Sequence, residues 1–353
     1  MSEYLISGIQ QIGLGVRDLE QSFRWYRRHC GFDIRLFEDR GEAGLMLRYT
    51  GGEPQERHAL LALNLQGGGG LELWQFTRRA PRPADFEVRL GDLGLFAVRL
   101  KARRVAAAHA ELAARGLPVL GPPRTDPAGA LTFFLRDGEG LLLEVTEGEG
   151  WFAPGRAPTG GVAGCLIGVS DIERALPLYS GLLGYDRLLY DVRGVFPDLA
   201  ALPGGEQEFR RVLLAHEQAR PGAFGPLLGP SRLELVQALG SRPRRIFQGR
   251  YWGDPGLIHL CFDVGGLDAL KQDFARRGYP FTVDSGGAFA MGGASGRFAY
   301  IEDPDGTLIE FVETYRLALL KGAGWYLDLR RRDPRRPLPR WLPRALALRR
   351  VRD

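Results

Sequence analysis

The chain has few of the residues and segments that mark several protein classes. Its 353 residues contain only three cysteines, five histidines and three methionines. Cys30, Cys165 and Cys261 are too few for a disulfide framework and are interpreted as reduced thiols. No run of eighteen apolar residues occurs, so we expect no transmembrane helix. The N-terminal residues lack the basic start and long apolar segment of a signal peptide, so we expect a cytoplasmic protein.

Positive charge is concentrated at the C-terminal end of the chain. The net charge is +5, but ten arginines and three aspartates in residues 328–353 alone give +7. The remainder therefore carries about −2, and we expect the body not to bind nucleic acid. We expect the tail to dock on the body or on another subunit. The alternative is a weak contact with an anionic surface.

A strand, a helix and two further strands can be read between residues 258 and 312. Apolar residues at alternate positions from 258 to 264 predict a strand with one packed face. Helical spacing follows over residues 267–277, and Asp303–Gly306 forms a turn between two predicted strands. His259 and Glu310 stand in the middle of these apolar strands, so each needs an explanation.

The same module occurs four times, and this repetition is the strongest signal in the chain. Modules one and three correspond at an offset of 153, which pairs Val16 with Val169 and Tyr26 with Tyr179. Modules two and four correspond at offsets of 162 and 166, which pair their Arg-Gly-x-Pro segments and their final strands. The growing offset indicates loop insertions in the second half. At 353 residues, two domains are expected.

The paired signals His259–Val264 and Asp303–Glu310 resemble a module of the vicinal oxygen chelate superfamily. That superfamily includes glyoxalase I, methylmalonyl-CoA epimerase, fosfomycin and bleomycin resistance proteins, and extradiol dioxygenases. The resemblance implies an α+β fold in which four βαβββ modules pair into two cupped mixed β-sheets, with helices on the outer faces. It also implies that side chains of first and last strands hold a divalent metal ion.

The expected domain boundaries follow from the repeats. We expect a first domain at residues 1–150 from modules one and two, and a second at 162–316 from modules three and four. Residues 151–161 form the predicted linker, and residues 317–353 form a basic tail rich in proline and arginine. Because a single module cannot cover its own sheet, we expect modules one and two to pair, and modules three and four. The repeat offsets predict that the two resulting domains superpose as two similar cups.

The resemblance implies a metal site in the C-terminal cup, formed by Glu234, His259 and Glu310. Gly164 occupies the fourth ligand position and leaves room for water. The mixed oxygen and nitrogen set suits one Zn, Mn, Co, Ni or Fe(II) ion. Tyr251 and Trp252 precede the His259 strand and are candidates for the pocket mouth.

The N-terminal cup is expected to be empty or weak. It offers Gln11, Glu72 and Glu144, while module two has Ala97 or Leu95 where a histidine would stand.

Two functions remain open at this stage. The first is a metal-dependent lyase, isomerase or epimerase that acts on a small oxygen-chelating substrate, with Glu234 as the base. The second is a non-catalytic small-molecule binder of the same fold. An extradiol-type dioxygenase is less favoured, because only one ligand histidine is present. A homodimer is a further expectation.

Overall fold

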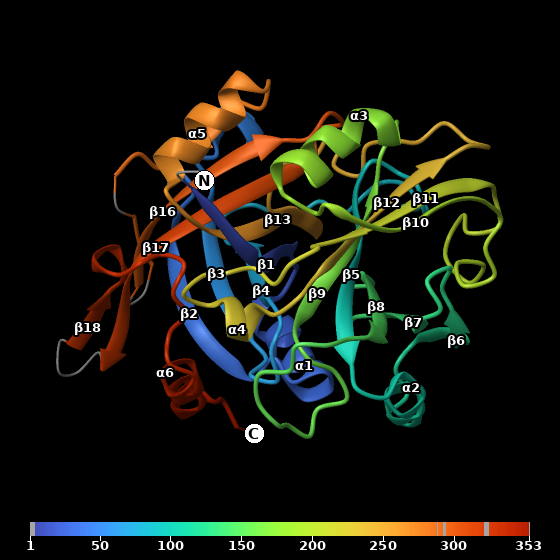
Figure 1. Ribbon diagram of the computed structural model, residues 1–353. Coiled ribbons are helices and arrows are strands. Elements are labelled where there is room, and N and C mark those ends of the chain that lie inside the picture. The colour runs from blue at the N-terminus through green and yellow to red at the C-terminus, as the bar shows by residue number, and fades with distance from the viewer. Residues whose placement is uncertain (1–3, 288, 292–293, 321–324, 353) are drawn as a thin grey trace.

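Two curved mixed β-sheets make up the body of the protein (Figure 1). The structure, a computed structural model, describes residues 4–287, 289–291, 294–320 and 325–352. Among these residues one sheet has ten strands and the other has eight. The expected fold class, α+β with paired modules in cupped sheets, is confirmed.

The first half of the chain contains modules one and two in the expected order of elements. Each begins with a strand, continues with a helix and ends with three strands. The elements of module one are β1 (Leu5–Gly15), α1 (Leu19–Cys30), β2 (Ile34–Glu42), the 3-10 turn Leu47–Tyr49, β3 (Glu56–Leu63) and β4 (Gly70–Phe76). Those of module two are β5 (Gly94–Ala102), α2 (Val105–Ala114), β6 (Val119–Thr125), β7 (Leu131–Arg136) and β8 (Leu142–Glu147).

The second half repeats this order with insertions, as the growing offset predicts. Module three comprises β9 (Val162–Gly168), α3 (Ile172–Leu176) with a π-helical continuation (Pro177–Leu182), β10 (Arg187–Gly194), β11 (Phe209–Ala215), the inserted α4 (Gly225–Leu228) and β12 (Arg232–Ala238). Module four comprises β13 (Gly256–Gly265), α5 (Leu267–Arg276), β14 (Val283–Asp284), β15 (Phe289–Met291), β16 (Ala294–Glu302) and β17 (Leu308–Leu320).

The pairing of modules differs from the expectation. The ten-stranded sheet runs β14-β16-β17-β13-β1-β4-β3-β2, with β15 paired to β16 and a tail strand, β18 (Trp325–Asp328), paired to β17, and it joins module one to module four. The eight-stranded sheet runs β10-β11-β12-β9-β5-β8-β7-β6 and joins module two to module three. In both cases the first strands of two modules pair antiparallel, β1 with β13 and β5 with β9. The expectation that residues 1–150 form one cup and residues 162–316 another is therefore wrong.

Modules one and two touch each other, as do modules three and four, but outside the sheets, through the segments that follow their first strands. Tyr26 on α1 donates a hydrogen bond to Asp137 of module two at 2.6 Å. Tyr179, which follows α3, donates the equivalent bond to Asp303 of module four at 2.9 Å. The aspartates lie in the turns that precede β8 and β17. Modules one and two, and modules three and four, are thus fixed to each other away from the concave faces, while the first strands pair module one with four and module two with three.

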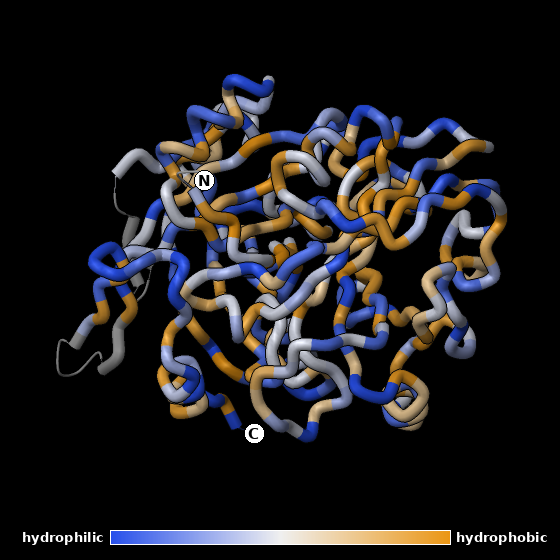
Figure 2. Tube along the Cα trace, in the orientation of Figure 1, coloured by the Kyte–Doolittle hydropathy of each residue, from blue (hydrophilic) through white to orange (hydrophobic). Residues whose placement is uncertain are grey.

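The sequence explains how α1 begins and which face it buries. Asp18 caps α1 by accepting from the backbone N–H of Gln21, and Gly31 ends the helix in the left-handed conformation. Phe23 and Tyr26 of α1 pack with Ile12 and Leu14 of β1 in the main hydrophobic core. Figure 2 shows hydrophobic residues along the central strands and hydrophilic ones over much of the periphery. The opposite face of β1, which carries Gln11, is therefore free to line a cup.

The C-terminal tail packs on the body, as expected. It contains β18 (Trp325–Asp328), two 3-10 segments (Leu329–Arg331 and Ala345–Arg349) and α6 (Trp341–Arg344). Its last residues run beside β2, where the N–H of Val351 donates to the carbonyl of Asp33 at 2.8 Å (Figure 1). The contact with an anionic surface stays a prediction.

Candidate metal centre

Four polar side chains from four adjacent strands meet on the concave face of the ten-stranded sheet. They are Gln11 on β1, Glu72 on β4, His259 on β13 and Glu310 on β17. His259 Nε2 lies 3.3 Å from Glu72 Oε2 and 3.2 Å from Glu310 Oε2. Gln11 Nε2 lies 3.3 Å from Glu72 Oε2. All four residues are buried, so their polar atoms are gathered in a place that is largely shielded from solvent.

Three of these side chains hold an atom with no hydrogen-bond partner among the described residues. These atoms are Gln11 Oε1, His259 Nε2 and Glu310 Oε2. Buried polar atoms are normally satisfied, and each unsatisfied one costs about 1–3 kcal/mol. One imidazole nitrogen, one amide oxygen and two carboxylates are a set that suits a divalent transition metal ion. The residues present therefore fit such an ion.

Strand register and one glycine place the histidine in this group. Gly13 on β1 is the register partner of both His259 and Glu72. A Cβ atom at position 13 would stand 2.3 Å from Cε1 of the His259 ring, so no side chain can be accommodated there. A β-bulge at Gln10 interrupts the pairing of β1 with β13, and both Gln10 and Gln11 line the cup.

Aromatic residues surround the histidine. The Tyr300 hydroxyl lies 3.5 Å from His259 Nδ1, which leaves Nε2 directed at the carboxylates. Trp252 is buried beside the His259 ring, and the two rings are nearly parallel with centroids 6.4 Å apart. Trp252 packs with Trp74 and Tyr300 and does not line the cavity. Tyr251 lies under the Arg79 guanidinium, also outside the cavity lining. Contrary to the expectation that they stand at the pocket mouth, Tyr251 and Trp252 do not line this cavity.

The charges of the group are coupled. Burial alone lowers the pKa of His259, but the carboxylates of Glu310 and Glu72 outweigh it and raise the pKa. Burial raises the pKa of Glu310 to about 7, with a further contribution from the nearby Glu72 carboxylate. Binding of a metal ion would therefore displace protons from this group.

The cup continues from these residues into an apolar cavity of about 190 Å³. Gln11, Glu72 and Glu310 line it together with apolar residues of the sheet, of α4 and of the C-terminal tail. An apolar cavity with a few convergent polar groups is the usual form of a small-molecule site.

The eight-stranded sheet holds a different cluster at the equivalent place. Arg99 on β5 donates to Glu144 at 2.6 Å and to Glu234 at 2.7 Å, and Arg211 donates to the other oxygen of Glu234 at 2.6 Å. Asp198 binds the far side of Arg211 at 2.8 Å. Burial alone raises the pKa of Glu234, but the guanidinium groups of Arg211 and Arg99 outweigh it and lower the pKa. The carboxylates of this cup are thus already neutralised by arginine.

Register shows why this second cup has no histidine. Ala97 pairs with Leu166 across β5 and β9, just as His259 pairs with Gly13 across β13 and β1. In the first cup the larger residue, His259, is on β13, whereas in the second cup the larger residue, Leu166, is on β9 and faces the small Ala97. Leu166 is fully buried in an apolar cluster. Gly164 stands at the position of Gln11, where a Cβ atom would lie 1.8 Å from the carbonyl oxygen of Arg232. This cup is therefore built without a ligand set.

The expected ligand sets must be corrected accordingly. His259 and Glu310 do lie together, but Glu234 lies in the other sheet, bound to two arginines. Gln11 and Glu72 complete the group around His259 instead of forming a degenerate site with Glu144. The complementary half-sets of modules one and four are the sequence signal that could have revealed this. Cys261 lies on the cup side, 3.9 Å from Gln10 Oε1.

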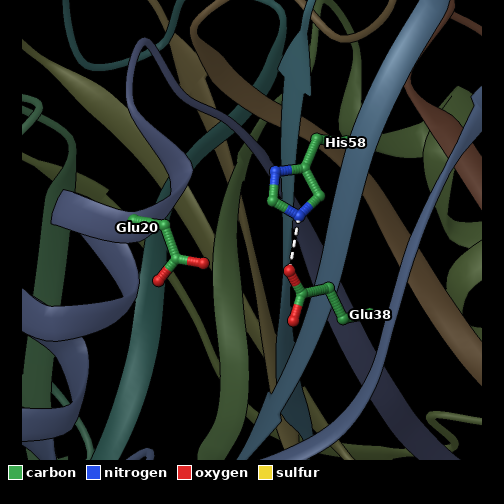
Figure 3. A group of neighbouring side chains, drawn as sticks. All are labelled: Glu20, Glu38 and His58. Atoms are coloured by element: carbon green, nitrogen blue, oxygen red, sulfur yellow. Dashed lines mark hydrogen bonds and ion pairs between the residues drawn. The ribbon is translucent and has the colours of Figure 1, made fainter.

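A second group with metal-ligand chemistry lies on the rim of the same sheet (Figure 3). His58 Nε2 contacts Glu38 Oε1 at 2.7 Å, and Glu20 of α1 lies opposite. Arg35 contacts both glutamates, at 2.6 and 3.4 Å, and Glu20 is exposed. Since a guanidinium already neutralises these carboxylates, this group does not need a metal ion.

Comparisons with known proteins agree with this architecture. Glyoxalase I from Zea mays has a TM-score of 0.53 at 14% identity and covers 87% of this chain and 92% of its own. A putative dioxygenase from Bacillus subtilis gives a TM-score of 0.53 at 14% identity, with 88% and 86% covered. At this identity the likeness concerns the fold alone. Among curated proteins, none matches the sequence significantly.

None of the helices in the described residues is long and apolar enough to cross a membrane.

The sequence profile of one family, the Glyoxalase/Bleomycin resistance protein/Dioxygenase superfamily, matches residues 8–145 and 161–311. Each match covers two successive modules, so the match follows the repeats in sequence and not the cups in space. The chain belongs to the Glyoxalase/Bleomycin resistance protein/Dioxygenase superfamily.

Proposed function

We propose that the protein is a metal-dependent enzyme of the glyoxalase type, a lyase, isomerase or epimerase, whose active site is the cup between modules one and four. Its ligands would be Gln11, Glu72, His259 and Glu310. The substrate would be a small molecule with two neighbouring oxygen atoms. A bound divalent metal ion would supply Lewis-acid stabilisation of negative charge on those oxygens.

The observation that carries this proposal is that three buried atoms around His259, namely Gln11 Oε1, His259 Nε2 and Glu310 Oε2, form no hydrogen bond among the described residues. A structural core histidine usually forms a hydrogen bond to a neighbour, whereas among the described residues Nε2 has only ion-pair contacts, at 3.2 and 3.3 Å, with two carboxylates. Ordinary packing gives no reason to bury this combination.

The chain's own residues supply the proton chemistry. Glu310 lines the cavity, and its carboxylate would act as the base that takes the carbon-bound proton. Tyr300 orients the imidazole of His259 through Nδ1. Glu72 accepts a hydrogen bond from the amide of Gln11 and so holds this side chain beside the other ligands. The surrounding apolar side chains exclude water from the reacting atoms.

The test has two stages. Protein stripped with a chelator and reconstituted separately with Mn²⁺, Zn²⁺, Ni²⁺ and Co²⁺ is expected to retain about one equivalent of one of these ions after gel filtration. Incubated in D₂O with a panel of α-hydroxyketones and 2-oxoaldehyde thiol adducts, the loaded protein is expected to exchange the carbon-bound proton beside the chelating oxygens.

Glu310→Gln is expected to abolish exchange, whereas Glu20→Gln, outside the cavity, leaves it unchanged. Less than a tenth of an equivalent of every ion would refute the metal enzyme. It would favour the second candidate, a small-molecule binder that uses the same apolar cavity.

The expected homodimer stays a prediction that size-exclusion chromatography with light scattering can check.

A further inference from the structure

The C-terminal tail forms one wall of the cavity above the candidate metal centre. Leu338, Leu342, Pro343 and Leu346 all line this cavity, together with residues of β1, β3, β4 and β17. None of these tail residues belongs to the four modules, and the segment was expected only to dock. Its position makes it part of the site.

Three separate anchors hold this wall in place. The N–H of Leu338 donates to the carbonyl of Ala223 before α4 at 2.9 Å. The guanidinium of Arg340 donates to the carbonyl of Phe152 at 2.7 Å. Arg350 contacts the Asp33 carboxylate at 3.0 Å and bridges to Ile34 at the start of β2. The segment is therefore fixed near both of its ends.

The tail presents one apolar face to the cavity. Leu342 and Leu346 are four residues apart and lie on the same side of consecutive helical turns. Leu346 packs with Leu63, Phe152 and Leu227, and Leu338 is only 3% exposed. Leu348 is 87% exposed and points away. A single face thus meets the cavity.

The cavity beyond the ligands offers little for a polar group. Its charged lining residues other than Glu72 and Glu310 are Arg297 and Arg349. Arg297 is held by Asp284 at 2.7 Å and by Asp268 at 2.6 Å. Arg349 donates to the carbonyl of Leu36 at 3.0 Å. Both cations are already engaged within the protein.

From these observations we infer that the C-terminal segment 338–349 is a specificity-determining wall, and that the substrate joins an oxygen-chelating head to an apolar chain or ring that contacts this wall. The inference rests on the proposed function for the head of the substrate. It adds the class of the remainder, which is an alkyl or aryl group in place of a charged or peptide-like one.

Alkyl hydroxamates test the inference, because they combine two neighbouring oxygens with a chain of chosen length. Metal content is measured first on the full chain, so a failure of metal binding is seen separately and counts against the proposed function. Binding of butanohydroxamate and octanohydroxamate to the loaded protein is then measured by calorimetry. Each buried methylene strengthens binding by about fourfold, so octanohydroxamate is expected to bind on the order of 100-fold more tightly.

Variants of the wall decide its role. Leu346→Asp is expected to weaken octanohydroxamate binding by roughly tenfold or more, the worth of about two methylenes, and to leave butanohydroxamate binding and metal content unchanged. Leu348→Asp, two residues away and exposed, is the matched control and should behave as the parent. Leu346→Trp tests the same point without a buried charge, since a larger side chain shortens the cavity and excludes only the longer ligand.

Equal affinity for both hydroxamates in the loaded parent protein would overturn the inference while the metal site stands. An unchanged preference for octanohydroxamate in both Leu346 variants would also overturn it. Thermal unfolding of each variant identifies a misfolded one, in which case the other variant decides.

Discussion

Exchange of one glutamate in each cup separates the ligand set seen in the structure from the set suggested by the sequence. Glu72→Gln removes a carboxylate that lies 3.3 Å from His259 Nε2. Glu234→Gln removes the carboxylate expected from the sequence to be the third ligand, which the structure places between Arg99 and Arg211. The two changes are chemically identical and should have opposite effects.

The magnitudes follow from the two environments. Loss of an outer-shell partner of a metal ligand costs about 10–100-fold in affinity, so loss of a direct ligand at Glu72 should cost at least about 100-fold. Glu234 is 1% exposed and forms contacts of 2.7 and 2.6 Å to two arginines that are 2% exposed. Removal of one partner of a buried ion pair costs about 3–5 kcal/mol. Glu234→Gln should therefore lower the free energy of unfolding by that amount and leave metal affinity intact.

The assay combines metal titration with urea unfolding in the presence of a chelator. Glu72→Gln is expected to lose metal while the chelator-treated protein keeps most of its stability. Glu234→Gln should bind one equivalent of metal as the parent does and unfold at lower urea. Loss of metal from Glu234→Gln with retention by Glu72→Gln would refute the pairing of module one with module four as the source of the site.

Three further predictions test the site and its surroundings. Removal of the metal with a chelator should lower the melting temperature by several degrees, because an ion at 100 times its Kd stabilises the native state by about 2.7 kcal/mol; an unchanged temperature in differential scanning calorimetry would contradict this. Gly13→Ala should weaken metal binding in calorimetric titration, because the new methyl group displaces the His259 ring, whereas Gly41→Ala, with open space around its Cβ, should not. Burial raises the pKa of Asp263 from 3.8 to about 7, so the folded protein retains a proton that the unfolded chain releases. Stability should then fall by up to about 4 kcal/mol as the pH rises from about 4 to 7, and Asp263→Asn should remove this fall in urea unfolding; an identical pH profile for both proteins would show that Asp263 is ionised in the fold.

Much of the local structure could be predicted from the sequence alone. Alternation of apolar residues predicts strands and helical spacing predicts helices, and the order of elements in each module is confirmed. The positions of Glu72, His259 and Glu310 in the middle of strands also follow from alternation, because a period of two assigns each side chain to one face. Both of these signals depend on residues close together in the chain.

Only the tertiary structure decided which modules meet. Every module has a similar first strand, and backbone hydrogen bonds between first strands do not depend on which module supplies the partner. The pairings of β1 with β13 and of β5 with β9 therefore cannot be predicted from local sequence. The choice shows in side chains far apart in sequence, such as Gly13 beneath His259 and Leu166 beside Ala97. The sequence determined which ligands each module could contribute. The packing of whole modules determined that one cup contains all four candidate ligands and that the carboxylates of the other cup pair with arginines. The physical reason is that complementary volume and charge take effect only when distant strands come together.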